Sequence, residues 1–136
     1  MIVDTLGLLL AVQVQPASLQ DPTGAPPVLV EALTKAPTLR LLWGDGRYSG
    51  PIVNMAASAL SLRVEVVAKP SAQKGFAVLP HRWVVERTFG WLGKYRRLAG
   101  RDFETNPRNS ETWIRICMSN LMVRRLAKMR ILKHHD

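Results

Sequence analysis

The sequence contains a single cysteine, Cys117, so no disulfide can form within the chain. It also lacks an apolar run of about 18 residues, the length a membrane-spanning helix requires, and we therefore expect no membrane partner. The first residues have no basic segment ahead of their apolar stretch, which argues against a secretory signal peptide. A lone cysteine among apolar neighbours is typical of a protein of the reducing cytoplasm.

Several common catalytic patterns are missing as well. No Cys/His spacing of the zinc-binding kind occurs, and no glycine-rich phosphate loop precedes a Lys-Ser or Lys-Thr pair. No Ser-His-Asp arrangement has the sequence context that nucleophilic catalysis needs. His134 and His135 lie beside Asp136 at the end of the sequence, where a frayed tail is expected more often than a metal site.

Positive charge is abundant but unevenly distributed. The net charge is +9, and residues 1–70 hold five basic and five acidic side chains. Residues 71–136 hold 14 basic against five acidic side chains and therefore carry the whole excess. Such an asymmetry favours a polyanionic partner on one part of the molecule, and the alternative is an ordinary solvated basic surface.

The apolar pattern predicts alternating strands and helices. An apolar run after Gly7 predicts a hairpin, and Ser49 and Ser110 are expected to cap helices. This order predicts an α/β fold with helices packed against a sheet, and the hairpin makes that sheet mixed. The expected strands are residues 2–3, 8–14, 39–43 and 63–67, and the expected helices are 28–33, 49–60, 81–93 and 110–128.

Asp45 stands directly after one predicted strand, between Gly44 and Gly46. In open α/β sheets, functional groups gather beyond the carboxyl ends of the strands, so Asp45 is a candidate metal ligand. The flanking glycines would let the backbone turn and a ligand approach. The alternative is a Gly-Asp-Gly turn whose acid is merely solvated.

Glu86 lies on the predicted helix of residues 81–93. Arg82 is one turn before it, and Gly90 and Gly93 follow on its own face, leaving space beside the carboxylate. A bare helix face beside a carboxylate leaves room for a phosphate or a metal ion, whereas the alternative is an ordinary Arg82–Glu86 surface pair. Val85, Phe89 and Leu92 are expected to form the opposite, core-facing stripe.

Basic residues interleaved with aromatic residues follow this helix. Such a mixture suits phosphate contacts with aromatic packing against sugars or bases, although the aromatics could equally be core and the arginines solvated. The cations between Arg124 and Lys133 are expected to be a cluster near a helix end rather than a specific DNA reader. The predicted phosphate ligands are Arg82, Lys94, Arg96, Arg97 and Arg101, with Trp91, Tyr95 and Phe103 interleaved.

Nearly the whole chain, including the segments around Asp45 and Glu86, resembles the carboxyl-terminal part of the DDE transposases of bacterial insertion sequences. The resemblance rests on the order and spacing of several specific segments. They are Val3-Asp4-Thr5-Leu6-Gly7, Trp43-Gly44-Asp45-Gly46-Arg47-Tyr48, Arg82-Trp83-Val84-Val85-Glu86-Arg87-Thr88-Phe89, Trp91-Leu92-Gly93-Lys94-Tyr95-Arg96-Arg97-Leu98, and the helix from Trp113 to Leu126.

The resemblance implies an RNase H-like fold in which three carboxylates hold two divalent metals, Mg²⁺ or Mn²⁺. Asp45 matches the second acid of the family and Glu86 the third. Arg82 and Glu86 match the Arg and Glu of the terminal signature. Leu79 stands where that signature has a Tyr, and Lys94 lies one residue beyond the usual Lys. The implied partner is DNA, both element ends and target, in a nucleoid-associated bacterial protein.

The first Asp of such proteins lies on a strand upstream of the hairpin. Asp4 is expected to belong to the hairpin loop, and Asp21 to the loop after it. We therefore expect residues 1–136 to be a partial catalytic domain lacking its first strand, with a basic helical portion from about residue 94. Alone it should be inactive, and an upstream transposase polypeptide or a second copy is a possible partner.

Two other functions remain open at the level of sequence. The chain could be a non-catalytic DNA-binding or regulatory module that keeps its cationic contacts without chemistry. It could also be a non-functional relic of a transposase, with exposed sheet edges that promote aggregation.

Overall fold

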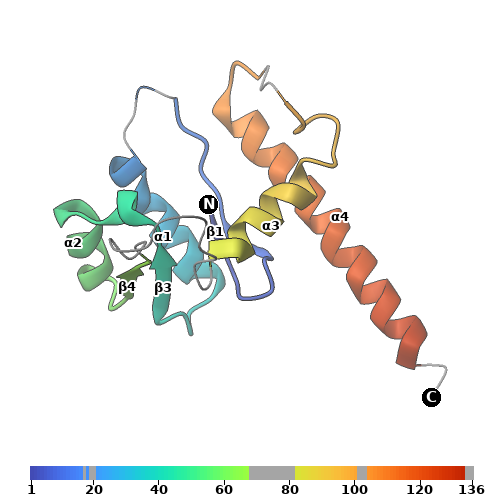
Figure 1. Ribbon diagram of the computed structural model, residues 1–136, viewed down its shortest axis with the longest axis horizontal. Helices are drawn as coiled ribbons and strands as arrows, with labels where there is room; N and C mark the ends of the chain where they lie inside the picture. The colour runs from blue at the N-terminus through green and yellow to red at the C-terminus, as the bar shows by residue number, and fades with distance from the viewer. Residues whose placement is uncertain (17, 19–20, 68–81, 101–103, 134–136) are drawn as a thin grey trace, which may run out of the picture.

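The computed structural model describes residues 1–16, 18, 21–67, 82–100 and 104–133. These residues form four α-helices and two pairs of strands, arranged as an α/β region joined to two crossing helices (Figure 1). The predicted α/β class is confirmed. The hairpin and the second pair of strands form two separate two-stranded sheets within the described residues, rather than the one mixed sheet that we expected.

The predicted hairpin is confirmed. Strand β1 (Ile2–Val3) pairs antiparallel with β2 (Leu9–Ala11). Oδ1 of Asp4 closes the loop by accepting the backbone N–H groups of Leu6 and Leu8 at 2.9 and 2.8 Å. Gly7 has a φ of 80°, a left-handed conformation that glycine adopts without steric cost.

The second sheet forms a parallel β–α–β unit. Strand β3 (Leu41–Gly44) pairs in parallel with β4 (Arg63–Val66), and α2 (Pro51–Ala59) connects them. Gly50, not the predicted Ser49, is the N-cap of α2, because the Ser49 hydroxyl donates to the carbonyl of Gly46 instead. A short 3-10 helix, η1 (Asp21–Gly24), leads into α1 (Ala25–Lys35), which begins earlier than predicted because proline is tolerated in a first turn.

Helix α3 (Arg82–Leu92) agrees closely with the prediction, whereas α4 (Pro107–Lys133) begins three residues before the expected cap. Oδ1 of Asn106 accepts the N–H of Arg108, so Asn106 satisfies the helix start and Ser110 is buried inside the first turns. Helix α3 crosses α4, and α4 extends well beyond the crossing toward the carboxyl end (Figure 1).

The hairpin links the two parts of the core. Ile2 packs against the buried side chains of α1, including Leu29 and Ala32. Leu8 and Leu9 pack instead against the cluster between α3 and α4, which is built from Leu92, Cys117 and Met118.

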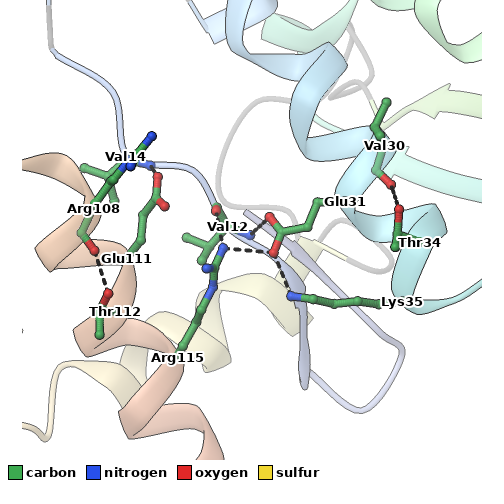
Figure 2. A network of polar contacts seen from close by, with 10 residues as sticks. All are labelled: Val12, Val14, Val30, Glu31, Thr34, Lys35, Arg108, Glu111, Thr112 and Arg115. Carbon is green, nitrogen blue, oxygen red and sulfur yellow. Dashed lines mark hydrogen bonds and ion pairs between the residues drawn. The ribbon is translucent and has the colours of Figure 1, made fainter.

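A single carboxylate, Glu31 on α1, adds a polar connection between distant segments (Figure 2). Oε1 accepts from Lys35 Nζ at 2.6 Å and from an Arg115 guanidinium nitrogen at 2.9 Å, while Oε2 accepts the Val12 N–H at 3.3 Å. Burial alone would raise the pKa of Glu31, but Lys35, Arg115 and the Val12 N–H together lower it below 4.5. Glu111 adds a second link from α4 by accepting the N–H of Val14 at 3.0 Å.

Candidate catalytic and nucleic-acid-binding site

Asp45 lies where the sequence predicted, immediately after β3. It is half-buried and is the N-cap of a short 3-10 helix, η2 (Gly46–Tyr48), with its Oδ1 accepting the N–H of Arg47 at 2.9 Å. This hydrogen bond holds the carboxylate at the carboxyl end of the parallel pair. Neither flanking glycine has a positive φ: at Gly44 a Cβ would lie 3.3 Å from that of Tyr48, and at Gly46 the space is open.

Glu86 lies in the middle of α3 and is exposed. Among the described residues, a Cβ added at Gly90, one turn later, would meet no atom within 4 Å, so the predicted open space beside the carboxylate is present there. At Gly93 a Cβ would lie 3.3 Å from the carbonyl oxygen of Phe89, so the open space does not extend to this second glycine, contrary to the prediction. The convergence of Asp45 and Glu86 on shared metal ions stays a prediction.

The expected core stripe of α3 is partly wrong. Phe89 is 58% exposed, whereas Thr88 is fully buried beside Leu92. Thr88 can be buried because its hydroxyl bonds the carbonyl oxygens of Gly7 and Val84, at 2.8 and 3.1 Å. The helix is thus rotated so that its threonine faces the hairpin, and Phe89 shares the exposed side with Glu86.

The predicted phosphate ligands have different surroundings. Lys94 and Arg96 are exposed in the turns that follow α3. Arg97 binds Glu104 with a nitrogen–oxygen distance of 2.7 Å and lies 5.0 Å from the Trp113 ring centre, so it already has partners within the protein. Arg82 begins α3, and Arg101 lies outside the described residues.

Alternating aromatic and cationic side chains connect α3 to α4, a feature that the sequence analysis missed. The Arg87 guanidinium lies 4.4 Å from the Trp83 ring centre and 4.8 Å from that of Trp91. Arg125 of α4 lies 4.3 Å from the same Trp91 ring. The spacing of four residues between Trp83, Arg87 and Trp91 places them on one helix face and could have indicated this stack.

Among the described residues, no group of three or more His, Cys, Asp or Glu side chains is arranged to hold a metal ion. Nor does any helix in this part of the chain have the length and apolar character needed to cross a membrane.

A comparison with protein families matches residues 1–122 to the transposase DDE domain. The chain belongs to this family. The match includes the hairpin, the parallel pair with Asp45, helix α3 with Glu86, and the part of α4 that packs on α3. Comparison of this DDE domain with curated proteins and with solved structures found no match. Family membership supports a role in transposition, which implies a DNA substrate and, in general, dependence on divalent metal ions.

Proposed function

We propose that this chain contributes to DNA transposition as part of an RNase H-like catalytic domain, with Asp45 and Glu86 as two of its metal-binding carboxylates. The match to the transposase DDE domain across residues 1–122 carries the proposal. The position of Asp45 supports it, because the carboxyl end of a parallel strand is the usual location of functional groups in α/β folds. The open helix face beside Glu86 supports it further.

The donor chemistry fits Mg²⁺ or Mn²⁺, since both prefer carboxylate oxygens. Bound metals of this kind activate an attacking oxygen and stabilise a leaving oxygen in phosphoryl transfer. In this chain the N–H of Arg47 orients Asp45, and Glu86 is exposed on α3, one turn before Gly90. The phosphate ligands proposed from the sequence are Arg82, Lys94, Arg96, Arg97 and Arg101, of which Arg101 lies outside the described residues.

Asp4 is a poor candidate for a third carboxylate. Its Oδ1 accepts two backbone N–H groups of the hairpin loop, from Leu6 and Leu8. Because the described residues form no group of three ligands, we expect weak metal binding by this chain alone. We accordingly expect no cleavage of element-end DNA by the 136-residue chain with Mg²⁺ or Mn²⁺; cleavage abolished by Asp45→Ala would overturn this expectation.

Titration with Mn²⁺ tests the metal proposal directly. Asp45→Asn and Glu86→Gln should each weaken Mn²⁺ binding by on the order of tenfold or more, as expected when a ligand is lost. The double variant should lose little beyond either single variant, because both acids would serve the same ions. Glu65→Gln, which removes an acid beside β3 on the neighbouring strand, is the matched control and should bind normally. Independent, additive losses at positions 45 and 86 would contradict a shared site.

A non-catalytic DNA-binding role is the second candidate function. It is favoured by the concentration of excess positive charge in residues 71–136, which requires no carboxylate to attract DNA. Salt-dependent DNA binding that persists in Glu86→Gln, without any cleavage by the wild type, would support this candidate over the catalytic one.

A further inference from the structure

An open groove of about 380 Å³ lies between the end of α3 and the middle of α4. It is separate from the face of α3 that bears Glu86, because Trp91, five residues further along, faces away from that carboxylate. Four of its lining side chains are cations and the others are aromatic or aliphatic. The lining residues are Trp91, Lys94, Tyr95, Leu121, Arg124, Arg125 and Lys128.

We infer that this groove binds the phosphate backbone of DNA and does so without reading base sequence. The inference rests on the proposed function in taking DNA as the ligand and shares Lys94 with its proposed phosphate ligands, but it does not involve Asp45 or Glu86. Charge complementarity is the first reason. No acidic residue occurs between Glu111 and Asp136, or between Glu86 and Asp102. The cations of each wall therefore have no acidic residue close to them in the sequence.

The cations are arranged along one helix face. Leu121, Arg124, Arg125 and Lys128 follow the spacing that brings residues to the same side of a helix, and Leu121 anchors that side to the core. Four residues of α-helix rise about 6 Å, so Arg124 and Lys128 are separated by a distance comparable with that between neighbouring phosphates of one strand.

A helix-end role does not explain these side chains. The favourable effect of the helix dipole on a cation falls off within the last turn. Because α4 continues to Lys133, Arg124 and Arg125 lie more than one turn before its end. Among the residues that the structure describes, Arg124, Lys128 and Lys94 form no ion pair with a carboxylate, so their charge is not neutralised internally.

The aromatic residues of the groove are already engaged, which is why we infer backbone binding without base recognition. Two guanidinium groups, those of Arg87 and Arg125, lie within 5 Å of the Trp91 ring centre. The Tyr95 hydroxyl donates to the carbonyl of Cys117 and accepts from Asn120, at 3.1 and 3.0 Å. These rings form the wall of the groove, and the outward-facing groups left for a ligand are the ammonium and guanidinium groups.

Binding of a short, fluorescently labelled DNA duplex, followed by anisotropy over a range of salt concentrations in EDTA, tests the inference. The double substitution Arg124→Gln and Lys128→Gln should lower the salt slope by about 0.9 for each lost phosphate contact. At about 0.1 M salt this corresponds to a loss of affinity of roughly tenfold per contact. Two duplexes of unrelated sequence should bind alike.

The matched control is the double substitution Arg40→Gln and Arg63→Gln, which removes the same charge from the α/β region and should change binding much less. Should the groove variant misfold by circular dichroism, Lys94→Gln on the opposite wall should lower the slope by about 0.9. Equal losses in the control, an unchanged slope, clear preference for one duplex, or no DNA binding by the wild type would each overturn the inference.

The result is independent of the metal proposal. The assay contains no divalent ion, so Asp45→Asn and Glu86→Gln should bind DNA no more weakly than the wild type. If the groove variants bind DNA as tightly as the wild type, the inference that the groove binds DNA is wrong. The metal proposal would still stand, because it is tested separately by Mn²⁺ binding to the Asp45 and Glu86 variants.

Discussion

Residues 1–67 and residues 82–133 differ in both charge and construction. The first region holds four basic and five acidic side chains and buries small aliphatic clusters between helices and short strands. The second holds 13 basic and four acidic residues in two crossing helices and the segment between them, and the two helices share one buried cluster. The hairpin contributes side chains to the clusters of both regions, so the cationic helices depend on the neutral region for part of their core.

The difference in charge assigns a stable core and a cationic surface to different regions. Like charges on a cationic surface repel one another, and two crossing helices bury little apolar area on their own. Packing these helices on a nearly neutral region, with Glu31 and Glu111 as acidic links to α4, lets the positive charge remain outward and available to a polyanion.

The largest expected effect is the loss of a core side chain where the regions meet. Met118 is 2% exposed, and Met118→Ala should lower the free energy of unfolding by about 2–5 kcal/mol, through lost burial and the resulting cavity. Urea unfolding measures the loss, and hydrogen exchange shows where it falls. If the hairpin couples the regions, protection should fall in β3 and β4 as well as in α4. Met129→Ala, at a position 54% exposed on the same helix, should cost no more than about 0.5 kcal/mol.

Next in size is a change at the hairpin itself. A Cβ at Gly7 would lie 2.8 Å from Thr88 Oγ1, and the φ of 80° disfavours any other residue. Gly7→Ala should therefore destabilise the protein by at least about 1–2 kcal/mol, measured by thermal or urea unfolding. Gly46→Ala provides the control, because an added Cβ there meets nothing within 4 Å. Comparable stability of the two variants would show that the hairpin does not join the regions tightly.

A smaller effect is expected at the acidic link between α1 and α4. Glu31→Gln removes the charge that Lys35 and Arg115 share, and it should cost about 1 kcal/mol near neutral pH. Because folding lowers the pKa of Glu31, its ionised form stabilises the protein above its unfolded pKa, and this contribution is lost as pH falls through the folded pKa. The stability gap between wild type and variant should close below pH 4.5. If the stability difference between wild type and Glu31→Gln persists at lower pH, the destabilisation does not come from loss of the Glu31 charge.

The last prediction requires no substitution and concerns the reactivity of Cys117, which measures solvent access to the cluster between α3 and α4. Burial raises the pKa of the Cys117 thiol, and the side chain is only 4% exposed. Since the thiolate is the reactive form, the native protein should react with an alkylating reagent far more slowly than the urea-unfolded chain. Labelling at equal rates in both states would mean that the two helices separate readily.

Local patterns were sufficient to predict much of the fold. The hairpin around Gly7, the strand before Asp45 and the helix bearing Glu86 were all predicted from residue periodicity and turn residues. The start of α4 was misplaced because Ser110 and Asn106 are both good capping residues, and packing decided between them. The position of each candidate carboxylate along the chain was predictable, whereas its surroundings were not.

The sequence by itself determined the order of strands and helices, the position of Asp45 after a strand and of Glu86 on a helix, and the concentration of positive charge in the second half. These features depend on neighbouring residues and on composition. Only the tertiary structure decided that Thr88 rather than Phe89 is buried, that Trp91 lies between α3 and α4, and that Glu31 meets Arg115, 84 residues away. The physical reason is that such contacts depend on how each helix is rotated against its neighbours, and that rotation is set by packing between segments remote in sequence.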